Sequence, residues 1–433
     1  MYETVYRTIE AISSSLKEID PHLADVFQNC YPNTLQTTVE LLDDGTSFVI
    51  TGDIPAMWLR DSSAQIRPYM EMANEDADLR RLIRGVIHRQ AKFLLLDNYA
   101  NAFNKEPNDQ GHTGDLPPKG PGVWERKYEL DSLCYPVQLC AHYWRTTGDR
   151  SVFNEDVHGM FRQIVATMLI EQHHDQQSGY SFQRFQCPPS DTLPFDGRGT
   201  RTNYTGMVWS GFRPSDDACK YGYLIPANMF AVVILRDLGQ LALEMYDDAD
   251  LNESALKLAA EIEFGIETYG KVQHPEFGTI YAYETDGFGN YNLMDDANVP
   301  SLLSIPYLGY RPSEDPIYRN TRAFVLSPAN PSYYSGTYGR GVGSPHTPPG
   351  HIWPIGLIMQ GLTSTDPQEQ ESLIRTLAAT TADTNFMHES FHPDDPGTFT
   401  REWFAWANSL FGEFIARWVG GLTAADRTPS GSV

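Results

Sequence analysis

Cysteines and long apolar runs are both scarce in this chain. Its 433 residues include five cysteines without C-x-x-C spacing, which argues against a disulfide framework and against a zinc site. No apolar run reaches the length of a membrane-spanning helix, so we expect no membrane partner. The N-terminus lacks a basic region followed by an apolar core, which indicates a cytoplasmic protein unless a signal peptide has been removed. Sequons at Asn203 and Asn252 are weak evidence for secretion.

Basic residues are also scarce compared with acidic ones. The 32 Lys and Arg residues stand against 56 Asp and Glu residues, which gives a formal net charge of −24. Because such a surface repels phosphate backbones and anionic lipids, we expect neither nucleic acid nor a membrane surface as a partner. The acidity itself is explained by solubility.

Several motifs of well-known enzyme classes are missing. The sequence has no Gly-x-x-x-x-Gly-Lys, no Gly-x-Gly-x-x-Gly after a strand, no Gly-x-Ser-x-Gly and no His-Glu-x-x-His. These absences make nucleotide-binding, dinucleotide-binding, serine-hydrolase and zinc-protease functions poor first choices.

Helical periodicity dominates what is present. Apolar residues recur at steps of three or four, which predicts twelve helices, whereas strand-like segments near 38–50 and 278–284 are hairpin-sized. The expected helices lie near 3–28, 61–73, 76–97, 129–147, 151–177, 220–246, 250–271, 297–308, 314–325, 350–363, 366–383 and 402–420. We therefore expect an all-α fold, an (α/α)6 barrel with small β-hairpin decorations. A solenoid of helix pairs is the alternative, but no repeat supports it. We expect one catalytic domain over 1–422 and a frayed polar tail over 423–433.

Aromatic and polar residues gather at the junctions between these helices. Aromatic residues make up 12% of the chain, and many stand beside Gly, Pro, Asp or Arg. The segment from Thr51 to Gln65 combines Trp58, Arg60 and Asp61, a mixture with which proteins hold sugars through charged hydrogen bonds and an aromatic face. For a single Arg–Asp pair, pinning of a loop would explain the residues equally well.

Adjacent carboxylates follow Pro214. Either Asp216 or Asp217 can cap the helix expected to follow. The other can lie against Trp209 or Phe212, and apolar walls with a nearby like charge raise a carboxyl pKa, as a general acid at neutral pH requires.

Two glutamates occur late in the chain. Glu389 lies between His388 and Ser390 on a loop with aromatic neighbours, which suits a base that orients water. Glu402 opens the last expected helix, where electrostatic capping explains it. Trp403 and Trp406 follow, and they can face a cleft or pack in the core.

Other junctions carry polar pairs with simpler explanations. His346 and His351 lie in a Gly- and Pro-rich loop, but no carboxylate has metal-ligand spacing near them, so we expect no metal. Asp295 and Asp296 precede an expected helix with Asn298 in its first turn, without the ligands of a calcium loop. Capping and salt bridging account for the acidic residues at another helix start, Glu129 and Asp131.

The junction motifs, in their order along the chain, resemble glycoside hydrolase family 125. The matching segments are TGDIPAMWLRDSSAQ, WSGFRPSDDA, MDDANVPSLLS, GSPHT and FTREWFAWANSLFGE, spread from 51 to 413. The resemblance implies an (α/α)6-barrel, exo-acting α-mannosidase that removes terminal α-1,6-linked mannose with inversion and needs no metal or other cofactor. Its partners would be α-mannoside oligosaccharides, and the oligomeric state is not indicated.

The resemblance also implies roles for single residues. It assigns the general acid to Asp216, with Asp217 as the alternative, and the general base to Glu389, with Glu402 as the alternative. The residues that would hold the terminal mannose are Arg60, Asp61 and His346, with Trp58 or Trp403 against the ring. Two other functions stay open: another helical-barrel carbohydrate enzyme, such as a glucoamylase-like hydrolase or a phosphorylase, and a non-catalytic mannoside-binding protein.

Overall fold

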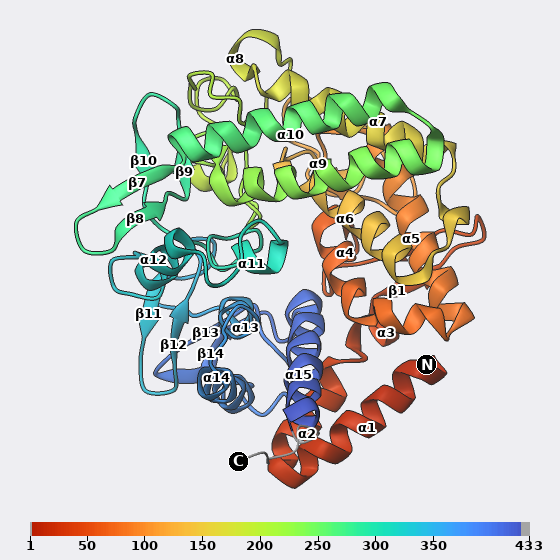
Figure 1. The fold of residues 1–433 in the computed structure, drawn as a ribbon, viewed down its shortest axis with the longest axis vertical. Helices are drawn as coiled ribbons and strands as arrows, with labels where there is room; N and C mark the ends of the chain where they lie inside the picture. The colour runs from red at the N-terminus through yellow and green to blue at the C-terminus, as the bar shows by residue number, and fades with distance from the viewer. Residues whose placement is uncertain (1, 426–433) are drawn as a thin grey trace, which may run out of the picture.

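The computed structural model describes residues 2–425, and its helices form an inner and an outer ring (Figure 1). The inner ring consists of α4 (Leu59–Ile66), α6 (Leu130–Thr147), α9 (Ile225–Tyr246), α11 (Ile305–Leu308), α13 (Pro354–Leu362) and α15 (Ala405–Ala425). Each follows an outer helix in the chain, respectively α2 (Pro21–Cys30), α5 (Ala77–Leu96), α7 (Glu155–Glu171), α10 (Ala249–Tyr269), α12 (Pro316–Val325) and α14 (Pro367–Ala379). Neighbouring inner helices pack together, as α4 does with α6, α6 with α9 and α15 with α4. The predicted (α/α)6 barrel is confirmed.

The remaining elements lie outside the two rings of helices. Helix α1 (Glu3–Ile19) packs on α2, and small helices occur at α3 (Asn33–Thr37) and α8 (His174–Gln177). Antiparallel hairpins are β1–β2 (Val39–Leu41, Ser47–Val49), β7–β8 (Lys271–His274, Gly278–Tyr281), β11–β12 (Tyr333–Ser335, Arg340–Val342) and β13–β14 (Ser390–His392, Asp395–Thr400). Three-stranded sheets join β3 (Met57–Trp58), β4 (Ala102–Phe103) and β5 (Val123–Glu125), and β6 (Tyr223–Leu224), β9 (Glu284–Thr285) and β10 (Tyr291–Asn292).

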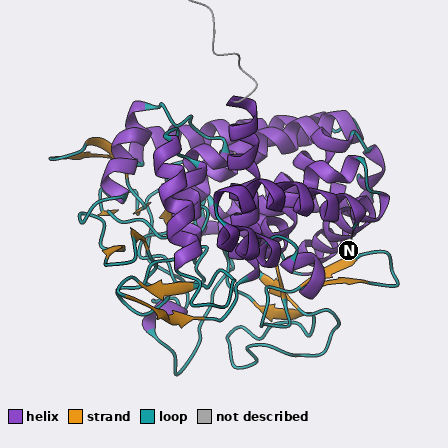
Figure 2. Cartoon of the chain, turned by 90° about the horizontal axis from the view of Figure 1, so that it is seen from below, coloured by secondary structure: helices purple, strands orange, loops and turns teal. Residues whose placement is uncertain are grey.

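The two ends of the barrel differ in their loops. Inner helices lead to outer ones through short connections, such as Asp247 and Asp248 between α9 and α10. Outer helices lead to inner ones through long segments that hold most of the strands, and Figure 2 shows strands and loops gathered at one end. All inner helices therefore point their N-termini toward this end. Their free N–H groups and dipoles favour acidic and hydroxyl groups there.

Two predicted helices are shorter than expected. The segment 3–28 is divided at Asp20, whose side chain accepts the backbone N–H groups of the next helix, with Pro21 in its first turn. The segment 297–308 is helical only in α11, because its first part is a loop fixed by hydrogen bonds to Asp295.

Several predicted helices start further along the chain than expected, and for two of them this changes the meaning of the acidic residues before the helix. Helix α9 begins at Ile225, so neither Asp216 nor Asp217 caps it, and that explanation is wrong. Helix α15 begins at Ala405, so Glu402 lies in the preceding loop and not in the first helical turn.

Helix α9 also corrects the expectation that no apolar run reaches membrane-spanning length. By length and composition it could cross a bilayer, but 78% of its most apolar window is buried inside the fold. Such burial is typical of a central helix in a barrel, because its whole circumference meets protein.

One main hydrophobic core includes buried residues from Val5 to Val419. It thus draws on both the first and the last helix of the barrel. Helix α15 extends to Ala425, and the rest of the tail predicted over 423–433 lies outside the described residues.

Asp295 organises the loop that leads to α11. Its two carboxyl oxygens accept the backbone N–H groups of Leu302 and Leu303 at 2.8 and 3.0 Å. The carboxyl is fully buried, and burial raises its pKa to about 8 despite these hydrogen bonds. The loop carries Asn298 to the barrel mouth.

We expect Asp295→Asn to flatten the dependence of stability on pH. Because the folded state holds the Asp295 proton up to about pH 8, the wild type should lose stability as pH rises from 5 to 8, by at most about 1.4 kcal/mol per pH unit. The neutral amide cannot ionise, so the variant should lose less. Urea midpoints at pH 5 and 8 measure this difference, and equal pH dependences would contradict it.

Candidate active site

A cavity of about 260 Å³ opens at the barrel mouth. Its lining comes from the segments that precede the inner helices and from the first turns of two of these helices. The lining residues are Thr51, Asp53, Ile54, Trp58, Arg60, Asp61, Pro214, Ser215, Asp216, Asn298, His346, Trp353, Glu389, Arg401, Phe404 and Trp406. Aromatic walls with a few converging polar groups are typical of a small-molecule site.

Arg60 lies at the bottom of this site with its side chain only 3% exposed. It belongs to the first turn of α4, which Trp58 precedes as the N-cap residue. Its Nη1 donates to Glu129 Oε2 at 2.7 Å and to Asp131 Oδ2 at 3.1 Å. Its Nη2 donates to Asp216 Oδ1 at 3.0 Å. One guanidinium at the start of α4 thus joins carboxylates from two other segments of the chain.

Glu129 and Asp131 open helix α6, where capping or salt bridging was expected of them. Glu129 is the N-cap residue, but its side chain makes no capping hydrogen bond, so the capping explanation is wrong for it, and its carboxyl contacts Arg60. Asp61 adds a fourth carboxylate 3.6 Å from Arg60 Nε and accepts the Thr51 hydroxyl at 2.5 Å.

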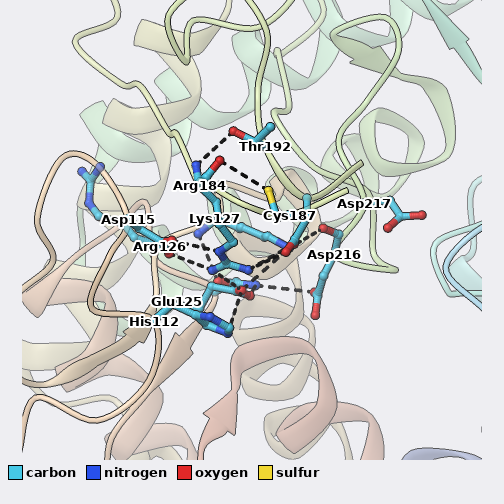
Figure 3. Close-up of polar contacts among 12 residues, drawn as sticks. His112, Asp115, Glu125, Arg126, Lys127, Arg184, Cys187, Thr192, Asp216 and Asp217 are labelled. Atoms are coloured by element: carbon cyan, nitrogen blue, oxygen red, sulfur yellow. Dashed lines mark hydrogen bonds and ion pairs between the residues drawn. The ribbon is translucent and has the colours of Figure 1, made fainter. Parts of the chain in front are cut away.

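Asp216 reaches the cavity from a tight turn. Its backbone N–H donates to Arg213 O at 2.9 Å, with Pro214 at the second position of the turn. Its φ of 66° is left-handed, which is uncommon for a residue other than glycine. Lys127 Nζ donates to the Asp216 carbonyl at 2.7 Å (Figure 3). The same amine pairs with Asp191. The turn is therefore held from outside the cavity.

Asp217 faces a different direction from Asp216. Figure 3 shows its carboxyl pointing away from the Lys127 network, and it is not among the cavity-lining residues. It accepts from His346 Nδ1 at 3.1 Å. Burial would lower the pKa of His346, but this hydrogen bond and the charges of Asp217, Asp216 and Glu389 raise it to about 9. His346 is therefore a cation at the cavity rim at neutral pH.

Glu389 lines the same cavity as Arg60 and Asp216, and it pairs with a different arginine, Arg401. Arg401 Nη1 lies 3.6 Å from Glu389 Oε1. Arg401 Nη2 pairs with Asp53, which lies in the segment before α4. Arg401 has a φ of 49°, so it is a second non-glycine residue of the cavity in the left-handed region. Glu402 is exposed and outside the cavity, and only its carbonyl is used, accepting from His388 Nδ1 at 2.7 Å.

Three tryptophans line the cavity, whereas a fourth packs outside it. Trp58, Trp353 and Trp406 line the cavity. Trp403 does not, and its ring lies against Gly52 behind the rim segment. The expectation that Trp403 contacts a sugar ring is thus not supported by its position.

Some cavity residues were missed although they lie inside the motifs that were singled out. Asn298 and Arg401 are two of them, and Trp353 directly follows the loop of His346. Nothing local distinguishes them from their neighbours; only the fold shows which side chains converge. Within residues 2–425, no group of three or more His, Cys, Asp or Glu side chains is arranged to hold a metal ion.

Residues 20–416 match the sequence model of the metal-independent α-mannosidases, glycoside hydrolase family 125. The chain belongs to this family. It is therefore a glycoside hydrolase, an α-mannosidase, as the resemblance implied. It is also 43% identical to the meiotically up-regulated gene 157 protein of Schizosaccharomyces pombe, over 95% of this chain and 85% of that protein.

Solved structures agree with this assignment. A metal-independent α-mannosidase of Streptococcus pneumoniae, in a non-productive complex with α-1,6-mannobiose, is 46% identical and superposes with a TM-score of 0.95 over 97% of this chain and 99% of that one. A bacterial glucoamylase complexed with acarbose matches with a TM-score of 0.55 at 13% identity, over 92% of this chain and 55% of the other. This second likeness shows the helical-barrel fold alone.

We expect Gly52→Ala to impair the family 125 site. Gly52 has a φ of 123°, and an added Cβ would lie 3.3 Å from the Trp403 ring and 3.6 Å from Arg401 Nη2. The added methyl group would push Trp403 and Arg401 away from their present positions. Because a small misplacement is costly in a preorganised site, kcat/KM should fall about 10–100-fold. Gly45→Ala is the matched control, since Gly45 also has positive φ, 79°, but no atom within 4 Å of the added Cβ. Equal kcat/KM values in the two variants would contradict this reading.

Proposed function

We propose that this enzyme is an inverting, exo-acting hydrolase of terminal α-1,6-linked mannose. One observation carries the proposal: Asp216 and Glu389 open into the same small cavity, each paired with a different cation. Glycoside hydrolysis uses a pair of carboxyl groups, and the resemblance to family 125 favours the inverting form, with one as acid and one as base. The complex of the Streptococcus pneumoniae enzyme with α-1,6-mannobiose supports the choice of linkage.

The size of the cavity supports exo action. Its volume of about 260 Å³ is below the range of about 300–1,000 Å³ for pockets that hold drug-sized ligands. A cavity of this size suits one terminal sugar, with the rest of the oligosaccharide outside.

Unpaired donors support sugar binding. Trp58 Nε1, Arg60 Nε and Arg401 Nε are buried, belong to cavity-lining residues and have no hydrogen-bond partner within the described chain. Buried donors of this kind are costly unless a ligand satisfies them. Hydroxyl oxygens of mannose supply the acceptors, so these three groups, with Asp61 and His346, would hold the sugar.

The proposed reaction proceeds in one displacement. Asp216 gives a proton to the glycosidic oxygen while the bond from that oxygen to C1 breaks. Glu389 takes a proton from a water whose oxygen forms the new bond to C1 from the opposite face. The products are the shortened oligosaccharide and β-mannose. Contacts that strengthen as the sugar approaches its oxocarbenium-like transition state accelerate the reaction.

Asp216→Asn and Glu389→Gln should each lower kcat on α-1,6-mannobiose about 10²–10⁴-fold, because each keeps the side-chain shape and removes acid or base function. Glu402→Gln is the matched control, since Glu402 is exposed outside the cavity, and its kcat should equal that of the wild type. Losses of only a few-fold in both cavity variants would overturn the assignment.

Proton NMR of the first-formed mannose tests stereochemistry and linkage together. With α-1,2-, α-1,3- and α-1,6-mannobiose as substrates, we expect fastest release from the α-1,6 isomer and β-mannose as the initial anomer. Initial α-mannose would mean retention. Release that requires added phosphate would indicate a phosphorylase, and no release at all would indicate a binding protein.

A further inference from the structure

Glu129 is a fully buried carboxyl directly behind the proposed acid. Its Oε2 accepts from Arg60 Nη1 at 2.7 Å and from the Ser132 hydroxyl at 2.8 Å. Its Oε1 accepts from Asn101 Nδ2 at 3.3 Å. Its side chain is 0% exposed, and it does not line the cavity. It therefore has no direct route to substrate.

Two of these donors, Arg60 and Asn101, also hold Asp216. Arg60 Nη2 donates to Asp216 Oδ1 at 3.0 Å, and Asn101 Nδ2 lies 3.5 Å from that oxygen. The guanidinium and the amide thus hold the two carboxyl groups next to each other. Because two neighbouring buried carboxylates repel each other, we expect one of the two to retain a proton.

The charges around the pair differ on its two sides. Asp216 faces Arg60, Lys127 and His346, whereas the leading charges on Glu129 are those of Arg60, Asp216 and Asp131. Burial raises the pKa of Glu129 well above its usual range. Burial acts in the same direction on Asp216, but the positive charges of Arg60, Lys127 and His346 hold the pKa of Asp216 below its usual range. Other ionisable groups near the pair and its cations include Asp61, Glu125, Asp191, Asp217 and Cys219.

We propose that Glu129 is a positioning residue that stores the proton which Asp216 delivers to the leaving group. The proposal rests on the role of Asp216 as the general acid. In the empty enzyme the proton lies on Glu129, and Asp216 is ionised beside Arg60. When substrate brings a glycosidic oxygen to Asp216, the shared proton moves from Glu129 to Asp216 and on to that oxygen.

The proton balance of one turnover is closed by solvent. The Glu129–Asp216 pair loses one proton to the leaving oxygen, and Glu389 gains one from the attacking water. Glu389 then releases its proton to solvent, and the pair takes one up. No oxidant, metal or other reactant is needed.

Glu129→Gln tests the proposal in the full-length enzyme. Glutamine keeps the acceptor for Arg60 but can give Asp216 no proton, so we expect kcat on α-1,6-mannobiose to fall about 10²–10³-fold, within the range for lost acid catalysis. The basic limb of the kcat/KM profile should move to lower pH, because Asp216 alone faces Arg60, Lys127 and His346. On 2,4-dinitrophenyl α-mannoside, whose leaving group needs no proton, the loss should be much smaller.

Asp131→Asn is the matched control. Asp131 binds the same Arg60 nitrogen as Glu129 and lies in the same helical turn. Its replacement should reduce turnover of both substrates by the same factor. A loss in Glu129→Gln that is equal for both substrates, with an unmoved basic limb, would overturn the proposal. Should that variant fold poorly, Glu129→Asp keeps an ionisable group and should preserve the basic limb.

Asp216→Asn separates this inference from the proposed function. If Asp216→Asn turns over 2,4-dinitrophenyl α-mannoside at nearly the wild-type rate but Glu129→Gln does not, Asp216 is the acid and Glu129 does not store its proton. If both variants turn over this substrate far more slowly than the wild type, the assignment of Asp216 as the acid fails.

Discussion

The interaction on which the site depends is the buried contact between Arg60 and its carboxylates. One guanidinium at the start of α4 holds Glu129 and Asp131 at the start of α6 and Asp216 in the segment before α9. Removing one partner of a buried ion pair typically costs about 3–5 kcal/mol, because the remaining charge is left unpaired. The relative positions of three barrel segments are therefore fixed by one residue, and the proposed acid is fixed with them.

A second cation performs the same task on the other side of the cavity. Arg401 joins Glu389 to Asp53, so the late loop before α15 is tied to the early segment before α4. These segments are more than 300 residues apart in sequence, and their contact closes the ring where the first and last inner helices meet. The left-handed φ values of Asp216 and Arg401 show that both sides of the site hold unfavourable backbone conformations, which persist only where the surroundings over-determine them.

The sequence predicted the fold class because helical periodicity is a local signal, and it located the site because polar motifs accumulate at helix junctions. It could not separate Asp216 from Asp217, since adjacent residues have the same local environment and only the turn after Arg213 directs one into the cavity. It likewise placed Glu402 in a helix and Trp403 in the cleft, because a helix start was predicted too early. Glu129 was explained by salt bridging; its contact with Asp216 spans segments that only the closed barrel brings together.

The charge of the Arg60 cluster explains why a stored proton is needed at all. Four carboxyl groups surround one guanidinium, with Asp61 at 3.6 Å completing the set. Full ionisation would leave an excess of negative charge in a low-dielectric site, which buried groups avoid by retaining protons. The cations near Asp216 favour its ionised form, so in our proposal the proton is retained on Glu129, which burial keeps neutral. The arrangement that keeps Asp216 ordered therefore also withholds its proton, and Glu129, held beside it by Arg60 and Asn101, is the group able to return it.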